Sequence, residues 1–163
     1  MFTSDGQPTA PVADGDAIPL VYPLQGGHVL LVGARMRNLH TNTIKIQGRL
    51  RHPVTGDIVG EDTRTVVVEP VDGDPTQVQT NIQTNSQVAN IPACPNYSDR
   101  SLAGGLTWTI EITVTELYVA IPRTVTVTRT TVPTCGTGPN DPALCLCECG
   151  ADYVLGKCPT PNG

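Results

Sequence analysis

The stretch that decides the fold is residues 106–132. Its first part reads Leu106-Thr-Trp-Thr-Ile-Glu-Ile-Thr-Val-Thr115, with every second residue from Trp108 onward apolar. The residues between are threonine or glutamate, and this period of two predicts a strand with one buried and one wet face. After a short link, Thr124-Val-Thr-Val-Thr128 repeats the alternation. We predict an antiparallel hairpin and expect the core to form around it, because it carries the only tryptophan.

Other segments predict further strands separated by turns. Residues 28–37 are apolar on both faces at their start, which indicates a central strand, and residues 44–50 alternate between apolar and polar side chains. Shorter β-type segments follow at residues 63–69, 77–82 and 88–91. In total we expect seven to eight strands in an all-β, antiparallel immunoglobulin-like β-sandwich, with a closed barrel or jelly roll as the alternative.

The composition excludes several classes of protein. The net charge of the 163-residue chain is −5, without the basic stripe that binding to nucleic acid or an anionic membrane surface requires. Only 4% of the residues are aromatic, so the core must consist mainly of valine, isoleucine and leucine. No apolar run reaches the ~18–20 residues of a membrane span.

Six cysteines, five of them from Cys135 onward, indicate an oxidising compartment. The first residues have neither a basic nor an apolar leader region, so we expect an extracellular, cell-surface or periplasmic protein whose signal peptide has been removed. A cytosolic protein whose cysteines bind metal is the alternative. We divide the chain into an N-terminal tether or donor segment (1–18), a β-sandwich domain (19–135) and a Cys-rich tail (136–163).

The tail carries a motif known from another family. Cys147, Cys149, Tyr153 and Cys158 fall in register with the C-terminal half of an EGF-like module: Cys-x-Cys, two residues, Gly or Pro, an aromatic residue, four residues, Cys. Asp152 departs from that pattern where the family has Gly or Pro. This resemblance covers only the tail. It implies a Cys149–Cys158 bridge and no growth-factor activity.

Geometry limits the remaining disulfides. Residues two apart on an extended chain rarely reach the ~5.5 Å Cα separation of a disulfide with the right Cβ directions. A Cys145–Cys147 bridge is therefore disfavoured, and with it the Cys94–Cys135 bridge that would force it. Two choices remain, Cys94–Cys145 with Cys135–Cys147, or Cys94–Cys147 with Cys135–Cys145. Either choice staples the tail across the open end of the hairpin.

Two segments resemble proteins of one bacterial group. They are Gly26-Gly-His-Val-Leu-Leu-Val-Gly-Ala-Arg-Met-Arg-Asn38 and residues 147–158. Both are similar to segments of uncharacterised secreted or lipoprotein-type β-sandwich proteins of high-GC, myxobacteria-like bacteria. The resemblance implies a location in the cell envelope and no known activity.

Candidate metal ligands are few and widely spaced. His28, His40 and His52 lie twelve residues apart, and three imidazoles at equivalent strand ends suit zinc, although histidines at strand ends and turns need no metal. The tail offers a second set of possible zinc ligands, namely Cys145, Cys147, Cys149 and Cys158. Zinc sites more often show Cys-x-x-Cys spacing, so structural disulfides are the preferred interpretation of this set.

Carboxylates recur in two similar turns at residues 11–16 and 70–74, and further carboxylates are Asp57, Glu61 and Asp62. Together they are a candidate Ca²⁺ site, which needs roughly 6–8 oxygen ligands, whereas Asp-Gly is also an ordinary turn sequence. We therefore expect no cofactor, with Ca²⁺ as the alternative. No serine lies in a nucleophile motif, so we expect no catalytic residues and no enzyme.

Three tyrosines, Tyr97, Tyr118 and Tyr153, lie in predicted loops or strand ends and are candidate interface residues. The first hypothesis for function is a non-enzymatic structural or adhesion protein that contacts protein partners or associates with itself, including as a filament or surface subunit. Exposed strand edges favour this hypothesis because they accept strands from a neighbour. The alternative is a ligand-, carbohydrate- or calcium-binding module.

Overall fold

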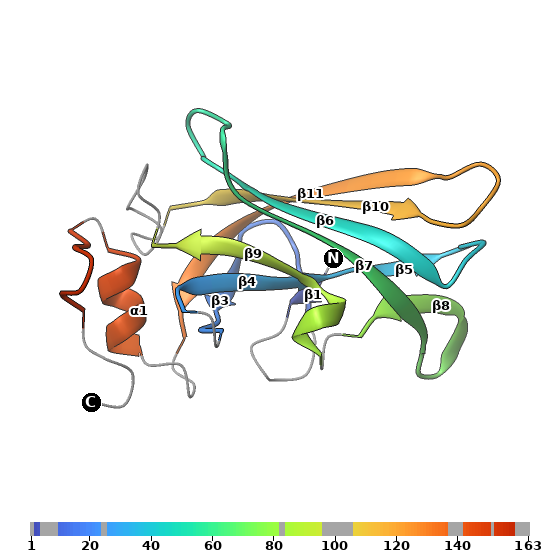
Figure 1. Cartoon of the computed structure of the whole chain (residues 1–163), viewed down its shortest axis with the longest axis horizontal. Coiled ribbons are helices and arrows are strands. Elements are labelled where there is room, and N and C mark those ends of the chain that lie inside the picture. Colours follow the sequence, from blue (N-terminus) through green and yellow to red (C-terminus); the bar gives the residue numbers. More distant parts are fainter. Residues whose placement is uncertain are drawn as a thin grey trace.

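The computed structural model describes residues 2–3, 10–23, 26–81, 84–95, 106–136, 142–150 and 152–158. They form a mostly β fold in which a curled sheet of seven strands packs on a sheet of four (Figure 1). The strands are β1 (Phe2–Thr3), β2 (Ala10–Pro11), β3 (Asp16–Leu20), β4 (His28–Gly33), β5 (Arg35–Arg37), β6 (Thr43–Arg51), β7 (Ile58–Val71), β8 (Asp74–Thr80), β9 (Ala89–Cys94), β10 (Trp108–Glu116) and β11 (Thr124–Cys135). A 3₁₀ turn, η1 (Asn85–Gln87), precedes β9, and one helix, α1 (Pro142–Glu148), lies in the tail.

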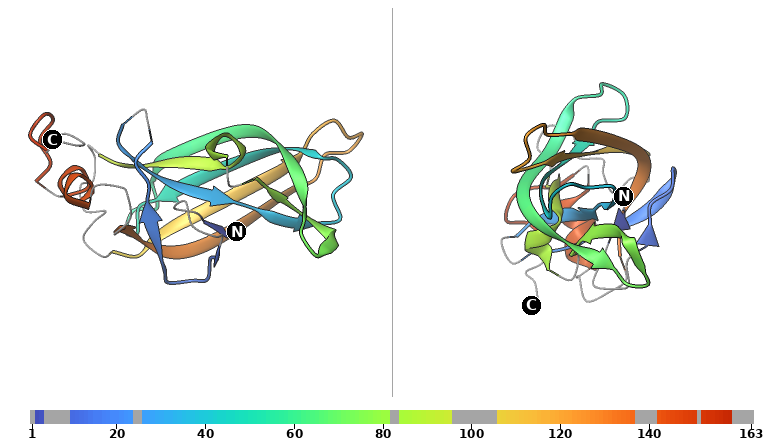
Figure 2. Two further views of the ribbon diagram at one scale, coloured as in Figure 1. Left: turned by 90° about the horizontal axis from the view of Figure 1, so that it is seen from below. Right: turned by 90° about the vertical axis from the view of Figure 1, so that its right-hand side faces the viewer.

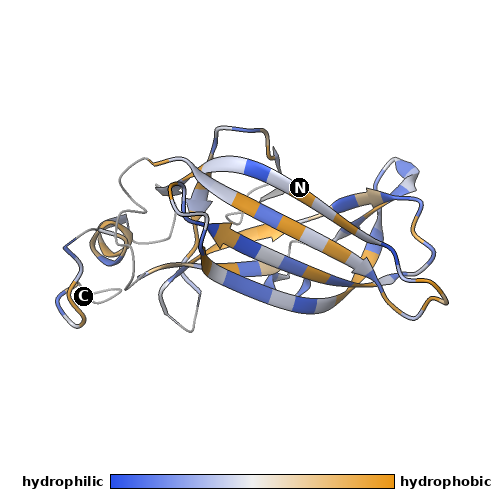
Figure 3. Ribbon diagram, turned by 90° about the horizontal axis from the view of Figure 1, so that it is seen from above, coloured by the Kyte–Doolittle hydropathy of each residue, from blue (hydrophilic) through white to orange (hydrophobic). Residues whose placement is uncertain are grey.

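The predicted hairpin is confirmed as β10–β11 of the larger sheet, whose order is β3-β11-β10-β6-β7-β8-β5. The alternating residues of β10 face the interior, where Trp108 and Ile110 have no exposed surface. β6 pairs with β10 on the other side, and its Ile44, Ile46 and Leu50 are also fully buried, as their spacing predicts. The polar faces of these strands point outward, which gives the alternating colours of the sheet in Figure 3.

The predicted single strand over residues 28–37 is divided into two strands. β4 lies in the smaller sheet, of order β2-β1-β4-β9, whereas β5 pairs with β8 at the edge of the larger sheet. Ala34 is the switch point, where the Ala34 N–H donates to Thr80 Oγ1 at 3.1 Å and the Thr80 N–H donates to the Ala34 carbonyl at 3.0 Å. The chain thereby crosses from one layer to the other and curls the larger sheet (Figure 2).

The prediction of a wholly antiparallel fold is wrong at one pair of strands. β3 runs parallel to the end of β11, with Thr131 opposite Asp16 and Cys135 opposite Leu20. Ile18 and Leu20 are fully buried, so their apolar side chains hold β3 in the sheet. The domain boundary predicted after residue 18 therefore falls inside a strand.

Two glycines let the layers approach each other closely. A Cβ on Gly48 of β6 would lie 2.7 Å from Ile91 Cγ1 of β9. A Cβ on Gly60 of β7 would overlap the carbonyl oxygen of Pro92 on β9. Because that oxygen belongs to the backbone, it cannot rotate away, and only glycine fits at residue 60.

The helix in the tail explains why the Cys149–Cys158 bridge, implied by the EGF-like resemblance, is wrong. The structure pairs Cys94 with Cys149, Cys135 with Cys145, and Cys147 with Cys158. Residues four apart lie on one face of a helix, so α1 presents two cysteines together toward the sheets. The intervening cysteine points elsewhere and pairs within the tail. Of the alternatives from geometry, only the Cys135–Cys145 bridge is present.

We predict that Gly60→Ala destabilises the fold by about 1–3 kcal/mol, because the added methyl group meets an immovable carbonyl oxygen. Gly136→Ala is the matched control, since its Cβ would have only an ordinary contact, 3.6 Å from Pro19 Cβ. Urea unfolding measures both variants. Equal urea midpoints for the two variants would contradict the close approach of Gly60 on β7 to the Pro92 carbonyl oxygen on β9.

Candidate functional site

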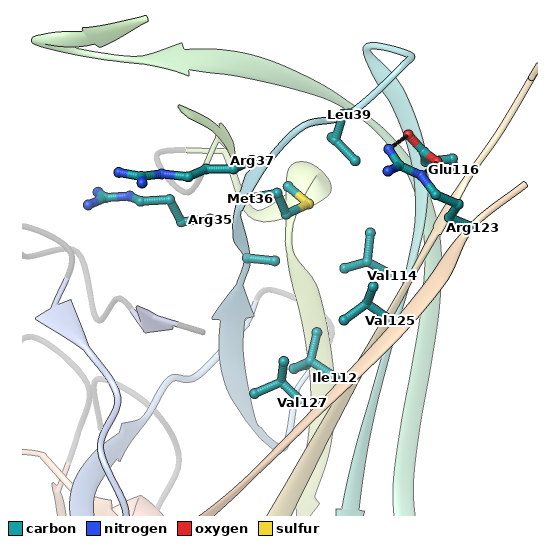
Figure 4. Close-up of a pocket in the computed structure, with 11 residues that line it drawn as sticks. Arg35, Met36, Arg37, Leu39, Ile112, Val114, Glu116, Arg123, Val125 and Val127 are labelled. Carbon is teal, nitrogen blue, oxygen red and sulfur yellow. Dashed lines mark hydrogen bonds and ion pairs between the residues drawn. The ribbon is translucent and has the colours of Figure 1, made fainter. Parts of the chain in front are cut away.

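An apolar groove opens at the end of the molecule opposite the tail. It lies between β5 with the residues that follow it and the β10–β11 hairpin, and has a volume of about 250 Å³. In Figure 4 the valines of the hairpin point across the groove toward Met36 and Leu39, whereas Arg35 and Arg37 point away from it. The lining residues are Ala34, Arg35, Met36, Arg37, Leu39, Ile112, Val114, Glu116, Arg123, Val125 and Val127.

The groove exists because the inner face of β11 is left partly uncovered. Val125 and Val127 pair with Val114 and Ile112 of β10, so all four belong to the inner face. Ile112 is only 3% exposed, but Val125 is 62% exposed. Val125 therefore exposes apolar surface to solvent, although it lies on the inner face of the sheet, where apolar side chains are normally buried.

The outer edge of β11 beside the groove offers backbone hydrogen-bonding groups. The backbone N–H and carbonyl of Thr130 both point away from β10. The N–H donates to Asp14 Oδ1 at 2.8 Å, and the carbonyl accepts from the Gly15 N–H at 2.9 Å. The period of two places the same groups of Thr124, Thr126 and Thr128 on that edge. Among the described residues, no strand pairs with this edge before Thr131. An unpaired edge of this kind is a template for another strand.

Arg129 lies near the end of this unpaired edge, close to where β3 begins to pair with β11. It is the register partner of Ile110, and its Nη1 donates to the Thr128 carbonyl at 2.9 Å. One outward carbonyl is thus satisfied by a side chain. A charged side chain on the inner face of an edge strand limits uncontrolled edge-to-edge pairing.

An ion pair between the buried Glu116 and the half-exposed Arg123 supports the mouth of the groove. The Glu116 carboxylate is 1% exposed and accepts from Arg123 Nε at 2.6 Å and Nη2 at 2.9 Å, and from the His40 N–H at 2.7 Å. Arg123 also donates to the Asn38 carbonyl. These bonds tie the residues after β5 to the hairpin tip. Arg123 and the other donors lower the pKa of Glu116 to about 2.

The structure does not bring the three candidate histidine ligands, His28, His40 and His52, together. His40 lies beside Glu116, with 3.9 Å between Nδ1 and Oε1, and the side chain of His52 accepts from the Val54 N–H in the β6–β7 turn. His52 also stands edge-on to Trp108, with ring centroids 5.4 Å apart. His28 is buried at the tail end of β4. The three histidines therefore lie in three different parts of the structure.

The carboxylates of the candidate Ca²⁺ site are engaged separately. Asp16 accepts from the Ala13 N–H, Asp74 from Thr76 and Gln77, and Asp62 from Arg64. The only group of three potential metal ligands among the described residues contains no carboxylate. Calcium binding at these turns has no geometric support in the described part of the chain.

The candidate interface tyrosines differ from one another. Tyr118 is 87% exposed and Ile121 is 81% exposed, so both add exposed apolar surface at the hairpin tip. Tyr153 is only 6% exposed, which contradicts its prediction as an exposed contact residue. Tyr97 lies outside the described residues.

Sequence reasoning missed a second polar site, at the tail end. His28 is 1% exposed, packs edge-on against Tyr22 at 5.3 Å between ring centroids, and has Nδ1 3.0 Å from Glu148 Oε2. Burial lowers the pKa of His28 to about 4 and raises the pKa of Glu148. The disulfide sulfurs of Cys145 and Cys149 lie beside this imidazole, 3.9 Å from each other.

Comparison with known proteins assigns no family. No protein-family model matches the chain, and no curated protein matches it. Within the described residues, α1 is far too short to cross a bilayer, and no helix there is long and apolar enough to do so.

We predict that Glu116→Gln lowers stability at pH 7 and that its effect fades on acidification. The pKa of Glu116 falls from 4.5 to about 2 on folding. Its ionised form therefore stabilises the fold above pH 4.5, and this contribution is lost as the pH falls toward 2. Urea midpoints of both proteins at pH 7, 4.5 and 2.5 test this expectation. A gap that stays constant across this range would contradict it.

Proposed function

We propose that the protein is a non-enzymatic structural or adhesion subunit of the cell exterior that associates with a second copy of itself through β11. The observation that carries the proposal is an apolar groove beside an unpaired strand edge, with Val125 62% exposed. Three disulfides favour an oxidising location outside the cytoplasm.

We also propose that the two layers are an immunoglobulin-like sandwich. In favour of this, β11, β10, β6 and β7 follow one another in the larger sheet as strands G, F, C and C′ do in that fold, and β4 pairs with β9 as B with E. The crossover of β5 and the tryptophan on β10 rather than on β6 depart from the pattern.

The association follows from the geometry of the edge. If two β11 strands pair antiparallel about a two-fold axis at Thr126, Thr124 of one copy lies opposite Thr128 of the partner subunit. Val125 of one copy then lies beside Val127 of the partner subunit, so each groove receives apolar side chains. On pairing, the hydrogen bond from Arg129 to the Thr128 carbonyl is replaced by a backbone hydrogen bond from the partner subunit. The N-terminal strands pair within their own chain and are not needed as donors.

The apolar groove also favours the second candidate function, a ligand-binding module. Its volume of about 250 Å³ suits a small apolar ligand more than a carbohydrate or an ion, because the lining is mostly aliphatic. A protein that stays monomeric but binds an apolar fluorescent probe, with binding lost in Val127→Lys, would support this alternative.

We predict that Thr126→Pro abolishes self-association and leaves the monomer folded. Proline removes only the N–H that points outward, so the ladder to β10 is preserved, and proline is tolerated on strand edges. Thr126→Ala is the matched control, since it keeps the N–H and should keep the dimer. Sedimentation velocity over a hundredfold range of concentration measures the association. A wild-type protein that remains monomeric throughout, or a Thr126→Pro dimer, would contradict the proposal.

A further inference from the structure

The tail end of the molecule gathers three residues of metal-binding types, and one of them, His28, takes no part in a disulfide. One ring nitrogen of His28 and the Sγ atoms of Cys145 and Cys149 all lie within 4.8 Å of one another. All three residues are buried, and the two sulfurs are 3.9 Å apart. Zinc–sulfur bonds of about 2.3 Å at the tetrahedral angle separate two thiolate ligands by about 3.8 Å. The sulfurs therefore already have the spacing of a zinc site.

His28 provides an independent observation that points to a ligand. Both of its ring nitrogens are buried; Nδ1 faces the Glu148 carboxylate without hydrogen-bond geometry, and Nε2 has no hydrogen-bond partner within the described part of the chain. Buried polar atoms are nearly always satisfied, so an imidazole left in this state needs an explanation. Nδ1 lies 3.0 Å from Glu148 Oε2. A carboxylate beside one ring nitrogen orients the imidazole of a metal-binding histidine, so Nε2 is the nitrogen that would bind the ion.

The sulfurs become ligands only after reduction, because the thiolate is the form that binds metals. Each bridge reacts with two thiol groups of a reductant: R–S–S–R + 2 R′–SH gives 2 R–SH + R′–S–S–R′. Reduction of two bridges therefore consumes four thiols and frees Cys94, Cys135, Cys145 and Cys149. The freed thiols lose their protons to solvent on binding a metal ion.

We propose that the reduced protein binds one Zn²⁺ through Cys145, Cys149 and His28, with Cys94 or Cys135 as the fourth ligand. Both of these residues are covalently bonded to the first two ligands in the oxidised state, so their sulfurs already lie at the site. Three thiolates and one imidazole form an ordinary structural zinc site. The ion then holds α1 against β4 in a chain whose disulfides have not yet formed.

Co²⁺ titration of the full chain after reduction with a phosphine, without oxygen, tests this proposal. We expect one equivalent of Co²⁺ to give thiolate charge-transfer bands and tetrahedral ligand-field bands, which Zn²⁺ then removes. The double variant Cys147→Ser/Cys158→Ser is the matched control and should give the same bands, because that bridge lies outside the site. Cys145→Ser and His28→Gln should each bind Co²⁺ at least tenfold more weakly and with shifted bands.

Circular dichroism separates loss of the site from loss of the fold. The oxidised His28→Gln protein should keep the β spectrum of the wild type, so that its weaker Co²⁺ binding reports on the ligand alone. Absence of thiolate bands in the reduced wild type would overturn the proposal. Bands that are unchanged in Cys145→Ser or His28→Gln would also overturn it, as would a reduced chain that unfolds and does not recover its β spectrum with Co²⁺.

Discussion

Two disulfides from one face of α1 reach two different sheets, and the rest of the structure depends on this clamp. Cys149 is bonded to the end of β9 in the smaller sheet, and Cys145 to the end of β11 in the larger one. Bridges of this kind stabilise a domain by about 2–4 kcal/mol each, mainly by restricting the unfolded chain. In a chain with one tryptophan and one phenylalanine, such covalent links compensate for limited aromatic packing.

The two ends of the molecule are therefore closed by different kinds of interaction. The tail end has covalent bonds and a buried helix face, whereas the hairpin end has an ion pair between the buried Glu116 and the half-exposed Arg123. The crossover at Ala34 moves β5 away from β4 and leaves valines of β11 without a cover. Function is expected at the end that is less completely closed, since exposed apolar surface beside a free strand edge favours association.

The parts of the fold that follow from periodicity were predictable. The alternation in residues 106–132 and 44–50 predicts β10, β11 and β6 and the buried faces of β10 and β6, because side chains of a strand alternate strictly. The apolar face of β11 was also expected to be buried, but Val125 is 62% exposed. The parallel pairing of β3 and the crossover at Ala34 were not predictable, since both depend on long-range contacts that leave no local pattern. The same is true of the groove, which arises from the missing cover of β11 rather than from any motif.

The helix in the tail left a signal that the EGF-like resemblance obscured. Pro142 starts it, Leu144 and Cys145 are its buried residues, and Cys149 is buried directly after its last residue, four positions from Cys145. The EGF-like resemblance implied the Cys149–Cys158 pairing without reference to this spacing. The helix instead brings Cys145 and Cys149 to one side, where they pair with the two sheets.

Disulfide mapping of the native protein, by proteolysis under non-reducing conditions and mass spectrometry, tests the clamp most directly. The structure predicts three linked peptide pairs that join Cys94 to Cys149, Cys135 to Cys145 and Cys147 to Cys158, with no free thiol. A Cys149–Cys158 peptide, or native cysteines that all react with a maleimide, would contradict the account.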